Sequence, residues 1–388
     1  MSAIFWASLA LLAYTFAGYA ALVMLLARWR GRPVRREAWL PRVTVVMPVY
    51  NGAALVIPKL RSILGQSYPH ELLDVIVACD GCDDDTAPRA LSLQDPRVRV
   101  LDFPRRRGKA ACLRDAVAQA RADVIVLTDV RQRLDADAVR LLLENLADPQ
   151  VAGASGELVL EHDGESAFAR AIDAYWRHEV RLREAEAALH SSVGATGPFY
   201  AIRRECFVAP PLDTILDDVE IPMAAVMQRR RIVYDRRAIA YDRASTTLAD
   251  ERRRKIRTLA GNFQVVARNP RFLLPWRNPV ALQFVSHKVL RLAAPALLLA
   301  CFAANAALAA QGGFYGAMMV LQLLAYGMAL LGIAWPAATA FAPVRLAAAF
   351  VSLNACVVLG LVEFVANRRA HLWKMSEIAA KPERPRGT

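Results

Sequence analysis

The stretch VIVACDG at residues 75–81 decides the fold of the chain's soluble part. Its five apolar residues end at Asp80 and Gly81, the pattern of a strand that is buried on both faces and closed by a turn. Similar apolar runs cover residues 43–49, 98–101 and 124–127, and segments with a helical pattern lie between most of them. We therefore predict an α/β fold with a parallel sheet, beginning near residue 42 and covered by helices on both faces.

The composition of the chain predicts membrane spans in addition to this domain. The chain has 388 residues, of which 55% are hydrophobic, and a formal net charge of +13. The apolar residues are concentrated in a few segments, which predicts membrane spans plus one cytosolic domain. The arginines cluster beside these segments and in two loops, without the aromatic residues or the module of a nucleic-acid binder. Anionic lipid headgroups and a pyrophosphate substrate explain this distribution better than nucleic acid does.

Uncharged stretches define the expected membrane segments. Residues 2–27 carry no charge and are followed by a cluster of arginines, which predicts an N-terminal transmembrane anchor over 1–28 with its C-terminal end in the cytoplasm. Residues 292–344 also carry no charge, and with 346–366 they predict a C-terminal transmembrane region of about three spans over 292–367. The mixed aromatic and basic segment 276–291 is typical of an interfacial helix.

The side of the C-terminus stays open at this point. Three spans after a cytoplasmic domain place the C-terminus outside. The basic tail over 368–388 instead favours the inside, which would require one C-terminal segment to be re-entrant or interfacial.

Two strand ends and the turn between them carry the first candidate residues. Asp80 ends its apolar run, where a carboxylate can accept hydrogen bonds from a base or a ribose. Asp129 follows the run 124–127, where a carboxylate can hold a divalent ion that bridges two phosphates. Lys109 opens a predicted helix whose N-terminus, next to a glycine, favours a phosphate. The alternatives are an ordinary Asp-rich turn after Asp80 and a solvated basic turn before Lys109.

Two later segments supply candidates for the acceptor side. Residues 216–220 place three acids in five positions, and at the start of a helix one of them can act as general base on an acceptor hydroxyl. The alternative is the ordinary enrichment of acids at helix N-termini. Residues 194–198 form a turn of small residues that either lets an acceptor approach closely or has no role.

Taken in this order, the segments resemble the membrane-bound family-2 glycosyltransferases, the group that includes cellulose, chitin and hyaluronan synthases. The resemblance covers roughly residues 40–270. Tyr50 stands in a segment that looks like the family's nucleotide-binding turn, and Asp80 matches its nucleotide-contacting Asp. Lys109 matches the family's basic helix start, and Asp129 falls at its metal-binding D-x-D motif.

The resemblance extends to the acceptor side of the site. The turn that holds Gly194, Thr196 and Gly197 is similar to the family's acceptor-side turn. Asp217 and Asp218 correspond to its Glu-Asp motif, in which the second residue is the general base. The resemblance therefore implies a GT-A fold, Rossmann-like and mostly parallel, with a nucleoside-diphosphate sugar as donor and Mg²⁺ or Mn²⁺ as cofactor.

Two departures from the family pattern bear on activity. Arg131 stands at the second acid of D-x-D, so metal binding depends on Asp129 and a further ligand. The family's Q-x-x-R-W motif corresponds to residues 254–258, where Arg254 replaces Gln, Arg257 is kept and Thr258 replaces Trp. That Trp supports the acceptor sugar in polymerising members, so its loss puts processive synthesis in question.

These observations lead to one interpretation and two alternatives. We expect a metal-dependent, inverting glycosyltransferase of the inner membrane, acting from the cytoplasm on a polysaccharide or lipid-linked acceptor of the cell envelope. Asp218 would be the base, Arg254 and Arg257 would help the leaving diphosphate, and Tyr50 and Asp80 would hold the nucleoside. The alternatives are transfer of a single sugar to a lipid, and a degenerate transferase serving as a membrane scaffold in an export complex. The sugar, the acceptor, the oligomeric state and a partner subunit stay undetermined.

Overall fold

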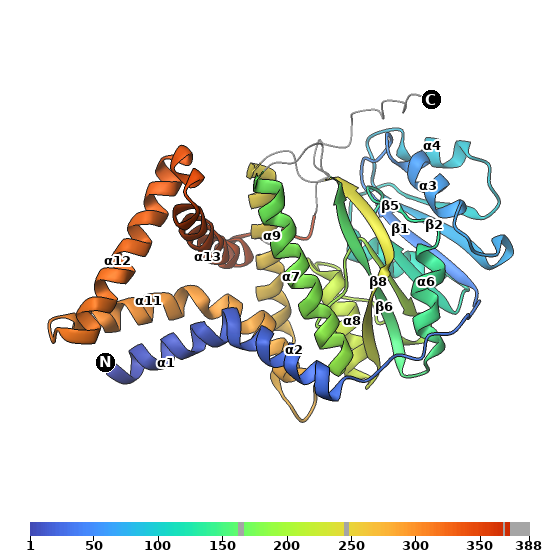
Figure 1. Cartoon of the computed structure of the whole chain (residues 1–388). Coiled ribbons are helices and arrows are strands. Elements are labelled where there is room, and N and C mark those ends of the chain that lie inside the picture. Colours follow the sequence, from blue (N-terminus) through green and yellow to red (C-terminus); the bar gives the residue numbers. More distant parts are fainter. Residues whose placement is uncertain (162–166, 244–247, 368, 373–388) are drawn as a thin grey trace. The chain divides into compact units, whose positions relative to one another are not determined.

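The computed structural model describes residues 1–161, 167–243, 248–367 and 369–372, and these form two compact units. The first unit comprises Met1–Leu22, Arg252–Arg268 and Leu282–Asn367. The second comprises Val23–Glu251, Asn269–Ala281 and the described part of the segment that begins at Arg368. We describe each unit by itself, and Figure 1 shows their elements.

The second unit is built on one mixed sheet of eight strands in the order β3-β2-β1-β4-β7-β6-β8-β5. The first four strands in this order are parallel, as is the pair β6 and β8, whereas β7 is antiparallel to β4 and β6 and β5 is antiparallel to β8. The mostly parallel sheet predicted from the sequence is therefore confirmed. The strands are β1 Val43–Val49, β2 Leu73–Asp80, β3 Val98–Phe103, β4 Val124–Thr128, β5 Arg133–Leu134, β6 Val151–Glu161, β7 Phe199–Arg203 and β8 Arg231–Arg243.

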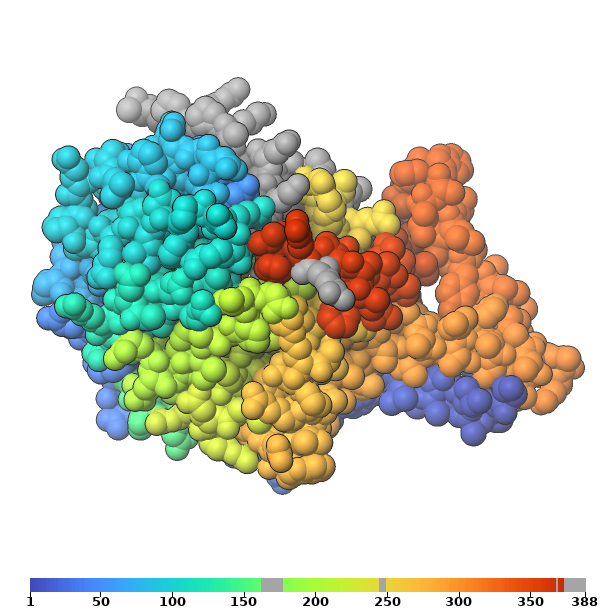
Figure 2. Space-filling view, turned by 180° about the vertical axis from the view of Figure 1, so that it is seen from behind, coloured from blue at the N-terminus to red at the C-terminus, as the bar shows by residue number. Residues whose placement is uncertain are grey.

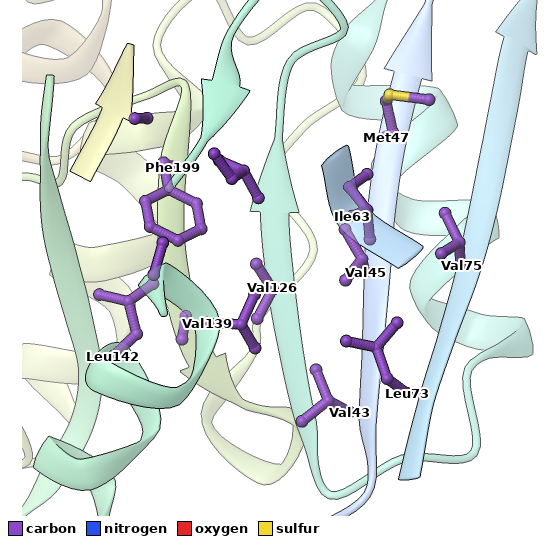
Figure 3. Packing of buried hydrophobic residues seen from close by; sticks show 14 of the residues in the cluster. Val43, Val45, Met47, Ile63, Leu73, Val75, Val126, Val139, Leu142 and Phe199 are labelled. Atoms are coloured by element: carbon purple, nitrogen blue, oxygen red, sulfur yellow. The ribbon is translucent and has the colours of Figure 1, made fainter. Parts of the chain in front are cut away.

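Helices cover both faces of this sheet, so its central strands are mostly apolar and are buried at almost every position. Val45 of β1 pairs in register with Val75 of β2 and Val126 of β4, and these side chains form one row of the core. Val139 and Leu142 of α6 pack against the same face (Figure 3). The helices of this unit are α3 Val56–Leu64, α4 Thr86–Ser92, α5 Lys109–Gln119, α6 Ala138–Glu144, α7 Ala167–Leu189 and α8 Asp217–Met227, with short 3-10 turns at His70–Leu72, Asn145–Ala147, Arg204–Cys206 and Pro270–Leu273.

The direction of the strands gathers distant segments at one edge of the sheet. Because β2 and β4 are both parallel to β1, Asp80 and Asp129 emerge at the same edge. Strand β7 runs the other way, and its first residue, Phe199, pairs with Thr128 at the end of β4. The turn that precedes Phe199 therefore joins this edge as well.

The first unit contains most of the apolar helices. Four helices of the described chain are long and apolar enough to cross a membrane by length and composition: Ser2–Arg30, Ala281–Ala309, Gly313–Ala334 and Ala342–Ala366. They comprise α1 Ser2–Ala13 with α2 Tyr19–Arg30, α10 Ala281–Phe284 with α11 Leu290–Ala309, α12 Gly313–Ala334 and α13 Ala342–Ala366. Each of the first two contains a π-helical segment, at Tyr14–Gly18 and Val285–Val289, and Tyr14 and Ser286 of these segments share a hydrogen bond of 2.8 Å. The interfacial position expected for 276–291 stays a prediction.

Helix α9, Leu248–Arg268, contributes its larger part to this first unit and packs closely against α13. A Cβ atom placed on Gly360 of α13 would lie 2.6 Å from Cβ of Leu259 and 3.2 Å from the backbone nitrogen of Ala260. Gly360 therefore allows the backbones of the two helices to approach, as small residues do between membrane helices.

We expect Gly360→Ala to lower the melting temperature of the detergent-purified chain, because overpacking of this kind costs about 1–3 kcal/mol. Gly327→Ala is the matched control. Gly327 lies in α12, another apolar helix, and a Cβ atom placed there would meet no atom within 4 Å. Equal melting temperatures for the two variants would contradict the close packing of α9 and α13.

Candidate active site

The carboxylate of Asp80 holds the basic turn in place. Asp80 is fully buried at the end of β2, and its two oxygens accept backbone N–H bonds from Arg107 at 2.6 Å and Gly108 at 2.9 Å. Gly81 has φ +62°, and a Cβ atom there would lie 2.4 Å from the backbone nitrogen of Arg106. The predicted strand end and the predicted basic turn are thus in direct contact, with Asp80 fixing the backbone that leads into α5.

Tyr50 lies beside this turn under a guanidinium group. The central carbon of the Arg106 guanidinium is 3.8 Å from the centre of the Tyr50 ring, a cation–π contact. The Tyr50 hydroxyl donates a hydrogen bond of 3.3 Å to Asp83 in the turn after β2. An aromatic ring and a cation therefore stand together next to Asp80, and nucleoside binding by Tyr50 and Asp80 stays a prediction.

Lys109 joins three distant parts of the sequence. Its ammonium lies 3.0 Å from Oδ1 of Asp129 at the end of β4 and 3.2 Å from Oδ2 of Asp217 at the start of α8. Burial by itself lowers the pKa of Lys109, but Asp129, Asp217 and Asp218 together raise the pKa above its ordinary value. The lysine is therefore positively charged, and it neutralises acids that would otherwise repel one another.

Asp218 lies against the turn of small residues. The backbone carbonyl of Asp218 accepts a 2.8 Å hydrogen bond from the backbone N–H of Ala195. A Cβ atom on Gly197 would lie only 2.8 Å from Oδ2 of Asp218, so the glycine leaves room for this carboxylate. The backbone N–H of Thr196 donates to Ser155 of β6 at 2.7 Å, which fixes the turn to the sheet. The predicted general base and the predicted acceptor-side turn are therefore neighbours.

Arg131 is paired with an acid on another strand. Its Nη2 donates to Oδ2 of Asp242 in β8 at 2.5 Å, and Gln132 donates to the same oxygen at 2.8 Å. Asp242 is almost fully buried, so this ion pair stabilises the fold next to the site. The residue that departs from the D-x-D pattern thus has a structural role, and Asp129 is the carboxylate that faces Lys109.

Comparison with known proteins bears directly on this arrangement. The sequence model of glycosyl transferase family 2 matches residues 44–208. An N-acetylglucosaminyltransferase from Rhizobium leguminosarum bv. trifolii is 31% identical over 139 residues, which cover 34% of this chain and 76% of that protein. The chain belongs to glycosyl transferase family 2.

Longer family-2 proteins match over a part of their length. An N-acetylglucosaminyltransferase from Rhizobium meliloti (strain 1021) is 29% identical over 186 residues, which are 47% of this chain and 42% of that protein. The match therefore spans less than half of this relative.

A solved structure matches nearly the whole chain. A mannosyltransferase from Pyrobaculum calidifontis, solved in complex with GDP-Man and Mn²⁺, is 26% identical with a TM-score of 0.70. The match covers 94% of this chain and 99% of that one. The GT-A fold predicted for the chain is confirmed by this similarity.

Lys59 is a buried residue beside the end of β4 that was not predicted from the sequence. It is 2% exposed on α3, and its ammonium donates to Oγ1 of Thr128 at 2.8 Å and to the backbone carbonyl of Gln132 at 2.7 Å. Burial lowers the pKa of Lys59 to about 7, although Asp129 and Asp242 oppose the shift. The helical spacing of Lys59 could have indicated its burial, because Lys59 lies on the buried face of α3 with Val56, Leu60 and Ile63.

Tyr200 is a second residue that the sequence analysis missed. Its hydroxyl is buried and has no hydrogen-bond partner among the described residues. Burial raises the pKa of Tyr200 well above its ordinary value, and Asp217, Asp218 and Asp129 add to the increase. The hydroxyl is thus a neutral donor close to the acids. Tyr200 reads as an ordinary strand residue, so no local signal marks it.

A short segment after the last helix reaches the basic turn. Gly108 has φ +94°, and a Cβ atom there would lie 3.0 Å from Cδ2 of His371 and 3.6 Å from Cδ2 of Leu372. In Figure 2 red atoms of this end of the chain border the teal atoms of the catalytic unit. The rest of the predicted basic tail, 368 and 373–388, lies outside the described residues.

The last two predicted donor residues lie on α9. Arg254 and Arg257 belong to Arg252–Arg268, the part of α9 that is grouped with the first unit. Their role toward a leaving diphosphate stays a prediction.

We expect Lys59 to make the stability of the chain depend on pH. Its folded pKa of about 7 lies below the ordinary value of 10.5, so between these values the unfolded chain binds the extra proton. Raising the pH from about 6.5 to about 9 should therefore favour the folded state, and Lys59→Met should lose this increment. The check is the melting temperature of both proteins across this range. Parallel curves for the two would contradict a neutral Lys59 in the fold.

Proposed function

We propose that the chain is an inverting glycosyltransferase that moves a sugar from a nucleoside diphosphate to a hydroxyl of a polysaccharide or lipid-linked acceptor. We place it at the inner membrane, with the catalytic unit on the cytoplasmic side. The observation that carries the proposal is the meeting of Lys109, Asp129 and Asp217 at the edge where Asp218 faces Gly197. A cation, strand-end acids and a base beside an open turn are the parts that displacement at an anomeric carbon requires.

The donor diphosphate would bind at the start of α5. Gly108 and Lys109 stand at the N-terminus of this 11-residue helix, where backbone N–H groups and the helix dipole favour an anion. Lys109 is positively charged there, and it would turn from the acids toward the phosphates when the donor binds. The names of the relatives support a mannosyl or an N-acetylglucosaminyl donor.

The donor set fits a divalent cation. Asp129 and Asp217 supply hard carboxylate oxygens on either side of one positive group, the Lys109 ammonium, so the pair already attracts a cation. Asp129 would hold Mg²⁺ or Mn²⁺ together with oxygens of the diphosphate, and the Mn²⁺ in the similar mannosyltransferase structure supports a divalent ion. When bound, the ion would supply charge neutralisation for the leaving diphosphate.

Asp218 would act as the base. Its carboxylate would take the proton of the acceptor hydroxyl while the oxygen forms a bond to the anomeric carbon and the bond to the diphosphate breaks. The attack comes from the side opposite the leaving group, so the configuration at this carbon inverts. Gly197 leaves room for the Asp218 carboxylate, which would meet the acceptor beside this turn. Arg254 and Arg257 would stabilise the charge on the leaving diphosphate.

One residue favours a short product. Thr258 stands where polymerising members of the family carry a Trp that supports the acceptor sugar. Transfer of a single sugar to a lipid acceptor is therefore the second candidate function.

The first test is transfer by the detergent-purified full chain, with Mn²⁺, membrane lipid extract and radiolabelled GDP-mannose or UDP-N-acetylglucosamine. We expect one donor to be used, Asp218→Asn to reduce the rate by roughly 100-fold or more, and Glu71→Gln, an exposed acid away from this edge, to leave it unchanged. Product size separates a polymer from a single labelled lipid, and NMR of the new linkage shows its configuration. Full activity in Asp218→Asn would remove Asp218 as the base.

A second variant tests the geometry around the base. Gly197→Ala should leave the melting temperature nearly unchanged, because the atom that a Cβ would meet is the end of the Asp218 side chain. The displaced carboxylate should nevertheless lower the transfer rate by roughly 10- to 100-fold. An unchanged rate would mean that the position of Asp218 is not critical.

A further inference from the structure

A second polar site lies at the opposite edge of the sheet. A cavity of about 470 Å³ is present where β6 and β8 begin, whereas Asp129 and Asp80 lie where β4 and β2 end. None of its lining residues is acidic, and four of the seven are arginines. We call it the arginine pocket, and it is lined by Arg32, Pro149, Gln150, His190, Arg229, Arg230 and Arg231.

Backbone carbonyls accept the hydrogen bonds that Arg229 and Arg231 donate in the arginine pocket. Arg231 is 3% exposed and donates to the carbonyls of His190 at 2.9 Å, and of Arg32 and Ala187 at 3.0 Å each. Arg229 donates to the carbonyl of Trp276 at 3.3 Å. A carbonyl satisfies the N–H groups of a guanidinium but leaves its charge in place.

Arg230 and the acids near the pocket complete this picture. Arg230 donates to the carbonyl of Pro149. Oε1 of the mostly exposed Glu205 lies 4.0 Å from Nη2 of Arg230. Asp148 is the buried acid close by, and its carboxylate oxygens accept the backbone N–H groups of Arg35 and Gln150. The two acids therefore leave much of the charge of the arginine pocket uncompensated.

The state of His190 reflects this crowding of positive charge. Its burial, followed by the charges of Arg32, Arg231 and Arg229, lowers the pKa of His190 to about 4, so the ring is neutral near pH 7. Four like charges share one cavity and repel one another. An anion in the cavity would remove this repulsion and stabilise the folded unit.

Chain connectivity places Arg32 and Trp276 only a few residues from two candidate membrane spans. Arg32 follows the helix Ser2–Arg30 by two residues, and Trp276 precedes the helix Ala281–Ala309 by five. A helix of 29 residues is about 43 Å long and exceeds the roughly 30 Å hydrocarbon core, so one end of Ser2–Arg30 would extend among the headgroups, and Arg28 and Arg30 in its last turn favour the C-terminal end. Trp29 and Trp276 are 71% and 70% exposed, as aromatic residues at a membrane interface are.

We propose that the arginine pocket binds the phosphate group of an anionic membrane lipid. The pocket supplies several guanidinium groups for one phosphate, and the two candidate spans that adjoin Arg32 and Trp276 in the sequence would keep it near such headgroups. Lipid binding in this pocket would hold the edge of the sheet where β6 and β8 begin at the headgroup layer. Asp129 and Asp218 lie at the opposite edge. The inference does not depend on the proposed transfer reaction, because it concerns binding and a different edge of the sheet.

The test uses the detergent-purified full chain and short-chain lipids of defined headgroup. Dihexanoyl phosphatidylglycerol, dihexanoyl phosphatidylcholine and inorganic phosphate are titrated while the melting temperature and the bound fraction are measured. We expect phosphatidylglycerol alone to bind and to raise the melting temperature. The double variant Arg229→Gln/Arg230→Gln should weaken this binding by about tenfold or more, since charged hydrogen bonds are lost.

A matched control separates the arginine pocket from general charge. Arg99→Gln/Arg121→Gln removes the same charge from exposed positions within β3 and just before β4, and it should bind phosphatidylglycerol as the unaltered chain does. Equal losses in the two double variants would overturn the site. Equal binding of phosphatidylcholine would overturn the need for an anion. Tight binding of inorganic phosphate would overturn the proposal that the phosphate group in the pocket belongs to a lipid.

Discussion

The ammonium of Lys109 between the carboxylates of Asp129 and Asp217 is the contact on which the catalytic edge depends. These acids come from a strand end and a helix start almost ninety residues apart in the chain, and Asp218 stands beside them. In a partly buried place such acids repel strongly unless a cation lies between them. The lysine therefore keeps the edge assembled before any ligand arrives. In the proposed reaction, a donor bound with a metal ion would take the place of this internal cation and leave the lysine to the phosphates.

The residues that the sequence predicted are those whose positions follow from strand direction. Asp80 and Asp129 end apolar runs, and parallel strands deliver their ends to one edge, so their proximity follows from the pattern alone. Lys109 was recognisable for a similar reason, since a glycine before a helix start is a local feature. The contact between Gly197 and Asp218 also involves two segments that the sequence analysis had singled out, although only the fold shows that they touch.

The residues that the sequence did not predict depend on contacts between distant elements. Arg131 departs from the family pattern, and its role becomes clear only through Asp242, 111 residues further along the chain. Lys59 lies in the apolar stripe of a helix, although a lysine ordinarily faces solvent. The Thr128 hydroxyl and the Gln132 carbonyl, which accept its hydrogen bonds, account for its burial. Tyr200 stands in β7, where it is one of four consecutive buried residues. In each case the contact that explains the residue is with a part of the chain too distant in sequence for a local pattern to include.

The contact between His371 and Gly108 has a consequence for the path of the chain through a bilayer. Every complete crossing exchanges one side of a membrane for the other. The chain leaves the second unit at Ala281 and contacts it again at His371, so if this unit lies on one face of a bilayer, the number of complete crossings between these residues must be even. Three helices in this interval are long and apolar enough to span. An even count requires at least one of them to enter or lie along the bilayer without passing through it, and it brings the two ends of this interval to a common face.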